Sequence, residues 1–277
     1  RRVLFRSTFA GNLTVSGGTV NLGASERLAN GSSLAISSGT LGLGAFDETV
    51  GSFTISGGTL GGTGTLTSGS GYALEGGTVS ANLGAGTTTA STGTTALNGT
   101  LAGPLNVSGG TVNLGASNRL SDSSAVAITS GILGLGSFDD TVSSFSISGG
   151  SLTGTGTLTS TSGYTLSGGT VTGNLGTGTA TASTGSTSLA GTLAGDLTLN
   201  GGTVTLASAD RLGNGSAVSI SSGSLDIGTF NDTVGSFTLT GGSLAGSTGI
   251  LTAATYALQG GTVNARLGGG AITVSTG

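Results

Sequence analysis

The 277-residue chain contains no cysteine, histidine, lysine, methionine or tryptophan, and Pro104 is its only proline. Without cysteine it can form neither disulfide bonds nor thiolate metal sites. The lack of histidine, lysine and cysteine removes the commonest general base, the Schiff-base nucleophile and the thiolate nucleophile, and leaves the serines without a partner base. The sequence therefore predicts a protein that is not an enzyme and that holds no metal and no cofactor.

Charged residues are scarce as well: they make up 6% of the chain, all seven basic residues are arginine, and the formal net charge is −4. This acidic balance lacks the basic footprint of a nucleic-acid-binding protein. No apolar run is long enough to cross a bilayer, and the N-terminus lacks the apolar core of a signal peptide. We expect no nucleic-acid partner and no membrane insertion by this segment.

Glycine, serine and threonine dominate the chain, and the apolar residues between them follow a repeat of 92 residues. The repeat predicts three units, at residues 8–99, 100–191 and 192–277, of which the third is truncated. Matching positions include Phe46, Phe138 and Phe230; Phe53, Phe145 and Phe237; Tyr72, Tyr164 and Tyr256; and Arg27, Arg119 and Arg211. Because apolar residues are plentiful and regularly spaced, the chain can bury surface and is not expected to be disordered.

The first seven residues, Arg1–Ser7, hold three of the seven arginines and none of the repeat pattern. The string RRVLFRS resembles the conceptual translation of a sequencing-library adapter, so we interpret it as a non-native segment. A natural basic N-terminus is the alternative. The chain also begins without methionine and ends inside a repeat, so we expect it to be a fragment.

A turn of the form Ser-Gly-Gly-Thr-Val recurs about every 20 residues within each repeat, with one longer gap between Glu75 and Ser108 that contains a weaker turn near Gly99. Apolar and polar residues alternate around these turns, as in Leu13–Val15, Leu34–Ile36 and Phe53–Ile55. Alternation with a period of two is typical of strands with one buried face. No stretch shows the helical period.

Short strands that recur about every 20 residues predict an all-β fold, a single-stranded parallel β-helix or β-solenoid, with about five coils per 92-residue repeat. A single coil cannot bury its apolar face alone, whereas stacked coils share a continuous core. We therefore expect one continuous solenoid of roughly fifteen coils. A meander of β-hairpins is the alternative, because Gly-Gly also forms hairpin turns. We favour the solenoid because one closed coil accounts for the spacing of about 20 residues between successive turns.

The string GGTVNLGASERLANGSSLAISSGTLGLGAFDETVGSFTISGGTL and its two later versions resemble the autotransporter-associated β-strand repeat of large bacterial surface proteins. The shared features are the Gly-Gly turn, an Asn-Arg-Leu-like loop and a Phe-Asp/Asn-x-Thr-Val-Gly-Ser segment. The resemblance covers nearly everything after Ser7. It implies a right-handed β-helix passenger region, located extracellularly or at the bacterial cell surface, with a structural or adhesive role as a stalk that presents loops.

Two other functions stay open. A β-helical polysaccharide lyase or hydrolase would place several acidic or basic groups in one cleft, and no such cluster is evident in the sequence. The Thr-x-Thr runs, such as Thr177–Thr181, also occur in ice-binding solenoids, although outward threonine is common on any strand surface.

Acidic or amide residues form adjacent pairs at one position of each repeat: Asp47-Glu48, Asp139-Asp140 and Asn231-Asp232. Paired carboxylates could serve a glycosidase, and acidic oxygens could bind calcium. However, adjacent side chains of an extended chain point apart, and the third pair has lost one acid. We therefore favour a polar turn between two strands.

One arginine per repeat follows a polar or acidic residue. A row of arginines on one face could bind anionic glycans, but a local ion pair on a surface loop is favoured. The candidate surface-binding residues are Arg27, Arg119, Arg211, Asp47, Asp139 and Asp232. The repeated tyrosines alternate with leucines, which predicts that they face the core and do not form a sugar-stacking platform.

The candidate partners are host or matrix glycans or proteins, and other copies of the chain. Unpaired backbone groups at the ends of a solenoid are templates for pairing with another chain. The strand-like segment Ala271–Val274 carries no charge and no proline that would block such pairing. We therefore expect self-association through uncapped solenoid ends.

Overall fold

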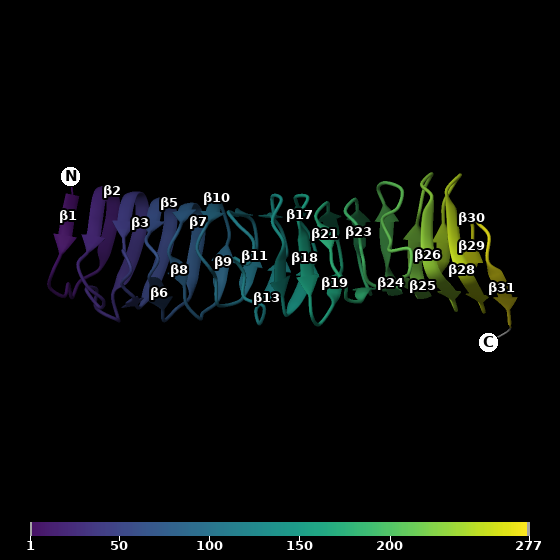
Figure 1. Ribbon diagram of the computed structural model, residues 1–277, viewed down its shortest axis with the longest axis horizontal. Helices are drawn as coiled ribbons and strands as arrows, with labels where there is room; N and C mark the ends of the chain where they lie inside the picture. The colour runs from purple at the N-terminus through teal and green to yellow at the C-terminus, as the bar shows by residue number, and fades with distance from the viewer. Residues whose placement is uncertain (1, 276–277) are drawn as a thin grey trace. The chain divides into compact units, whose positions relative to one another are not determined.

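The computed structural model describes residues 2–275, which contain strands and turns and no helix. The chain divides into two compact units, Arg1–Val142 and Ser143–Gly277, and the boundary falls inside the second 92-residue repeat. Both units are parallel β-solenoids (Figure 1), and together they contain about 14 turns. The all-β solenoid prediction is therefore confirmed. In the described range there is no helix that is long and apolar enough to cross a membrane.

Unit 1 contains fifteen strands of 2 to 10 residues each. They are β1 (Arg2–Phe5), β2 (Leu13–Leu22), β3 (Ser33–Gly42), β4 (Glu48–Val50), β5 (Ser52–Gly61), β6 (Thr65–Ser68), β7 (Tyr72–Val79), β8 (Asn82–Leu83), β9 (Thr88–Ala90), β10 (Thr94–Leu97), β11 (Leu105–Val107), β12 (Thr111–Leu114), β13 (Ala125–Ile128), β14 (Ile132–Gly134) and β15 (Asp140–Val142).

Unit 2 has the same construction. Its strands are β16 (Ser144–Ile147), β17 (Ser151–Thr153), β18 (Thr157–Ser160), β19 (Tyr164–Leu166), β20 (Gly169–Val171), β21 (Asn174–Leu175), β22 (Ala180–Ala182), β23 (Ser186–Leu189), β24 (Leu197–Leu206), β25 (Ala217–Asp226), β26 (Asp232–Leu239), β27 (Ser243–Ala245), β28 (Ile250–Leu258), β29 (Thr262–Val263), β30 (Arg266–Leu267) and β31 (Ala271–Val274).

The core of each unit is a set of apolar columns, because side chains that alternate along a strand stack in register from coil to coil. In unit 1, one column runs through the successive partners Leu13, Leu34, Phe53, Tyr72, Thr88 and Leu105. In unit 2, the equivalent column runs through Phe145, Tyr164, Ala180, Leu197, Val218, Phe237 and Tyr256. Most of these side chains are fully buried, so stacking creates the core that no coil has alone.

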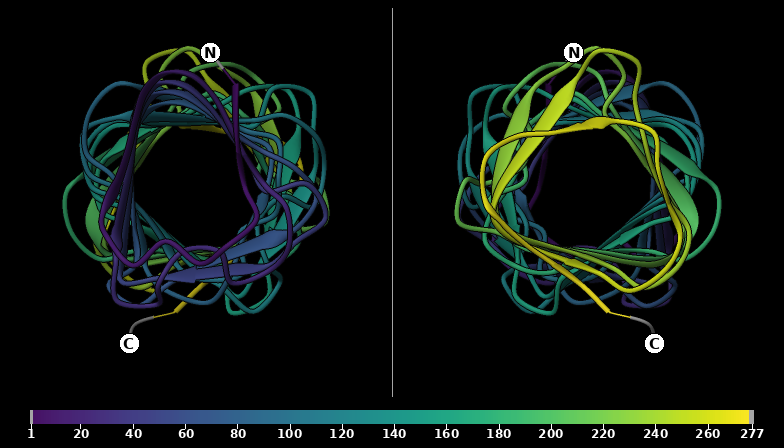
Figure 2. Two further views of the ribbon diagram at one scale, coloured as in Figure 1. Left: turned by 90° about the vertical axis from the view of Figure 1, so that its left-hand side faces the viewer. Right: turned by 90° about the vertical axis from the view of Figure 1, so that its right-hand side faces the viewer.

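The coils close on themselves, as Figure 2 shows for the first coils of unit 1 (left) and the last coils of unit 2 (right). The strand pairs within each unit are parallel, for example β2 with β3 and β24 with β25. A meander of hairpins would give antiparallel pairs. The hairpin alternative is therefore wrong.

The long gap in the turn pattern between Glu75 and Ser108 contains two short coils. Tyr72 pairs with Thr88 and Thr88 with Leu105, so these coils advance by 16 and 17 residues, against 21 from Leu13 to Leu34. Their inward positions hold small residues such as Thr88 and Ala90, both fully buried. Small inward residues weaken the apolar alternation, which explains why only a weaker turn marks this part of the sequence.

The Gly-Gly turns form the corners of the coils. Gly39 has a φ of +81°, and a Cβ atom there would lie 2.6 Å from the carbonyl oxygen of Gly18 in the preceding coil. Glycine is therefore required at position 39 for two reasons: its backbone conformation and the close approach of the stacked backbones.

The segment Arg1–Ser7, predicted to lie outside the repeats, contributes β1. This strand pairs in parallel with β2, with Arg2 opposite Thr19 and Phe5 opposite Leu22. Val3 and Leu4 stay exposed, so β1 adds backbone pairing and little core.

Candidate functional site

The adjacent polar pairs place their two side chains on opposite sides of the strand. The first member of each pair, Asp47, Asp139 or Asn231, is exposed. The second member is buried: Glu48 is 1% exposed, Asp140 2% and Asp232 1%. Two carboxyl groups of one pair therefore cannot face the same glycosidic bond. The prediction of Asp232 as a surface-binding residue is wrong, because Asp232 is the buried equivalent of Glu48 and Asp140.

Each buried carboxylate binds the main chain of the preceding coil. The N–H groups of Arg119 and Leu120 donate to Oδ2 of Asp140 at 2.7 and 3.1 Å. The same pair of bonds links Arg27 and Leu28 to Glu48 at 2.9 and 2.8 Å, and Arg211 and Leu212 to Asp232 at 2.7 and 3.2 Å. The carboxylate thus satisfies two N–H groups for which no main-chain acceptor is found within the described residues.

The glutamate and the two aspartates differ in how they use their second oxygen. Glu48 accepts one N–H on each oxygen atom. Asp140 and Asp232 accept both N–H groups on Oδ2, and their buried Oδ1 atoms have no hydrogen-bond partner among the described residues. The shorter side chain therefore leaves one polar atom of each aspartate unsatisfied.

Burial raises the pKa of all three carboxyl groups. Desolvation is the largest cause for Glu48, Asp140 and Asp232, because it penalises the charged form. The hydrogen bonds from main-chain N–H groups offset part of this rise in pKa. These groups consequently hold a proton more tightly in the folded chain than in the unfolded chain.

The repeated arginines fasten the same loop through main-chain carbonyl groups. Arg119 donates from Nε to the carbonyl of Ser117 at 3.1 Å and from Nη1 to that of Asn98, in the preceding coil, at 2.8 Å. Arg27 and Arg211 make the equivalent bonds. Within residues 2–275 these guanidinium groups bind carbonyl oxygens in place of the predicted ion pairs. Each half-buried arginine therefore links its own loop to the preceding coil.

The exposed members of the polar pairs also join coils. Oδ1 of Asp47 accepts the N–H of Thr65 at 2.8 Å, and Oδ1 of Asn231 accepts the N–H of Ile250 at 3.0 Å. The main-chain N–H of Asp139 donates to the hydroxyl of Ser117, in the preceding coil, at 3.1 Å. This is the hydrogen bonding of a polar turn between strands.

The repeated tyrosines lie in the core, as their alternation with leucines predicts. Tyr164 donates from its hydroxyl to the carbonyl of Leu158 at 3.1 Å and accepts the N–H of Ser160 at 3.1 Å. Its ring packs edge-to-face on Phe145, with centroids 6.3 Å apart. Tyr72 and Tyr256 repeat this arrangement with Phe53 and Phe237. No tyrosine platform faces a sugar at these positions.

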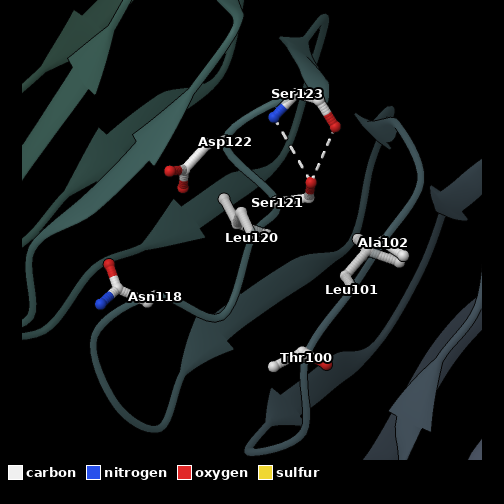
Figure 3. Close-up of a pocket in the computed structure, with 8 residues that line it drawn as sticks. All are labelled: Thr100, Leu101, Ala102, Asn118, Leu120, Ser121, Asp122 and Ser123. Carbon is white, nitrogen blue, oxygen red and sulfur yellow. Dashed lines mark hydrogen bonds between the residues drawn. The ribbon is translucent and has the colours of Figure 1, made fainter.

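A shallow groove crosses two neighbouring coils of unit 1 (Figure 3). Its lining residues are Thr100, Leu101, Ala102, Asn118, Leu120, Ser121, Asp122 and Ser123. Asn118 has a φ of +57°, a left-handed conformation that asparagine tolerates better than most residues. The hydroxyls of Ser121 and Ser123 lie 2.9 Å apart and share a hydrogen bond.

Sequence reasoning missed this groove. Asn118 enters the sequence interpretation only as the polar residue before Arg119, and Asp122 does not enter it. The available signal was a carboxylate and an amide four residues apart in every repeat: Glu26 with Asn30, Asn118 with Asp122, and Asp210 with Asn214.

The described residues contain no cluster of three or more acidic side chains that could hold a metal ion. The chain matches no protein-family model, no curated protein and no solved structure. The resemblance to the autotransporter-associated repeat therefore stays an expectation, and the solenoid fold stands on the coil-to-coil pairing itself.

Proposed function

We propose that this chain is a structural segment of a bacterial cell-surface or secreted protein, a stalk that presents its loops to a partner and carries out no catalysis. The observation that carries this proposal is the use of its polar side chains. Glu48, Asp140 and Asp232 bind the backbone of the preceding coil, and the repeated arginines do the same.

The competing function, a β-helical polysaccharide lyase or hydrolase, requires acid and base groups that face one cleft. The adjacent acids of this chain lie on opposite sides of the strand, and the inner acid of each pair is sealed in the core. A stalk needs no such cleft. It needs coils that stay stacked, and threefold repetition of the same fastening serves that need.

Antibody labelling of intact cells that express the gene tests the proposed location. The antibody is raised against the purified segment, and parallel samples are permeabilised or treated with an external protease. We expect labelling of intact cells and loss of the label after protease treatment. Labelling that requires permeabilisation would contradict the proposal, and a cytoplasmic marker protein controls for leakage.

A further inference from the structure

The groove lined by Thr100–Ala102 and Asn118–Ser123 carries a free carboxylate and a free amide. Within the described residues, neither the side chain of Asn118 nor that of Asp122 makes a hydrogen bond, and both are exposed. The chain elsewhere engages such groups between coils, for example Asp47 with Thr65 and Asn82 with Thr100. We propose that this groove, hereafter the corner groove, binds a neutral glycan.

The chemistry of the corner groove fits a sugar ring. Figure 3 shows the Asn118 amide and the Asp122 carboxylate on the same side of Leu120. A carboxylate accepts hydrogen bonds from two adjacent hydroxyls of one sugar, while an amide both donates and accepts. The hydroxyls of Thr100, Ser121 and Ser123 add further polar groups to the lining, while Leu101 and Leu120 lie in the core beneath it. Polar groups that converge on one concave surface fix the orientation of a small ligand.

Other ligand classes fit the corner groove less well. Calcium takes six to eight oxygen ligands, whereas the lining has a single carboxylate, Asp122. A uronic or sulfated glycan would meet the negative charge of Asp122 and gain no cation from the lining residues. A neutral polyhydroxylated chain has neither problem.

The other two repeats support the same chemistry with the roles exchanged. In the second repeat the amide is residue 118 and the carboxylate residue 122, whereas the third repeat has Asp210 and Asn214. Asn118 and Asp210 share the same left-handed backbone, with φ values of +57° and +55°. One carboxylate and one amide are therefore present at this corner in every repeat, although their order changes.

The spacing suits a polymer. Within unit 1, five successive pairings lead from Leu13 to Leu105, which is the distance between the first and second repeats of the corner. At about 4.8 Å per coil, equivalent positions lie roughly 24 Å apart. A linear glycan that spans this distance occupies two corners at once and gains avidity.

The inference rests on the proposed function, because a segment that presents loops needs a ligand for them. The test uses the whole chain and a panel of neutral glucose-, galactose- and mannose-built oligosaccharides, with a polyuronate oligosaccharide and Ca²⁺ alone as comparison probes. Calorimetry is first done on a background with Glu26→Gln and Asp210→Asn, which leaves Asp122 as the one carboxylate at the three corners. Glutamine keeps the acceptor that Thr49 uses on Glu26.

On this background, Asp122→Asn should weaken binding of a neutral oligosaccharide by about tenfold to a hundredfold, because it removes the charged acceptor. The exchange variant N118D/D122N reproduces the order of the third repeat and should restore binding to the background level. Glu75→Gln, which removes a carboxylate outside the corner groove, should leave binding unchanged. Binding should also be insensitive to salt between about 0.05 and 0.5 M, since the ligand carries no charge.

Three results would overturn the inference: no neutral oligosaccharide binds, Asp122→Asn binds as well as the background, or only the polyuronate or Ca²⁺ binds. Circular dichroism and thermal unfolding of each variant establish that the fold is kept. The recovered oligosaccharide is analysed as well. Cleaved sugar would contradict the proposed non-catalytic function and leave the binding site standing, whereas absent binding would overturn the site alone.

Discussion

Replacing Asp140 by alanine tests the role of the buried carboxylates. In the folded chain Asp140 is the acceptor for two N–H groups, those of Arg119 and Leu120. A buried donor that loses its partner costs about 1–3 kcal/mol. We therefore expect hydrogen exchange at these two amides to speed up by about 5- to 150-fold, since 1.4 kcal/mol corresponds to a factor of ten. The amide of Ser121, which donates to the carbonyl of Leu101, is the internal control.

The same substitution has a predictable effect on pH dependence. Burial raises the pKa of Asp140 above its ordinary value, so the folded state binds the proton more tightly than the unfolded state. The contribution of this group to stability is therefore fully present below the unfolded pKa, and it is lost as pH rises through the folded pKa. Glu48 and Asp232 act in the same direction.

No residue type in this chain ordinarily titrates between about pH 5 and 9, because histidine and cysteine are absent. A fall in melting temperature as pH rises from about 4 towards neutrality is therefore expected, and it should be smaller in Asp140→Ala. The matched control is Glu75→Gln, which removes an acid that is not among the causes of the raised pKa of Asp140. Unchanged exchange at Arg119 and Leu120 in the alanine variant would refute the reasoning.

Further substitutions probe the coil contacts. Glu48→Asp should lower the free energy of unfolding by up to about 1 kcal/mol, because only the longer side chain accepts the two N–H groups on separate oxygens. For the same reason Asp140→Glu should raise the free energy of unfolding by up to about 1 kcal/mol or leave it unchanged. Thermal unfolding of both variants measures this, and equal effects of the two exchanges would contradict it. Gly39→Ala should destabilise unit 1 by about 1 kcal/mol or more, as measured by urea unfolding. Gly17→Ala is the control and should have little effect, because there is open space around its Cβ position. Ile272→Lys should suppress concentration-dependent association in sedimentation, because it places a charge on the exposed strand β31; a parent chain that is monomeric at high concentration would count against the role of β31.

The period of the sequence predicted most of the fold. Alternation at positions such as Phe53–Ile55 indicates strands, and the regular spacing of the turns indicates coils. Both signals can be read from short stretches of sequence, and for that reason the fold was predictable. The coils that contain Thr88 and Ala90 gave only a weak signal in the sequence, because packing inside a solenoid accepts small residues that interrupt the apolar alternation. Their place is fixed by the register of the neighbouring coils.

The candidate site was only partly predictable. That the two acids of a pair point apart follows from strand geometry. The buried member of each pair could also have been predicted from the sequence, because Asp140 stands two residues before the buried Val142 and therefore lies on the same face of the strand. The recurring acid and amide mark residues of the corner groove in the sequence, but the groove itself could not be predicted, since it forms where loops of successive coils meet.

The central claim is that the polar side chains of this chain hold coils together and present a ligand site, and do no chemistry. Mass spectrometry of a neutral oligosaccharide after prolonged incubation with the purified chain tests this claim most directly. The account predicts that the sugar is retained by the chain and recovered at its original mass. Shortened or unsaturated products that disappear in a variant lacking Asp139 and Asp140 would contradict it.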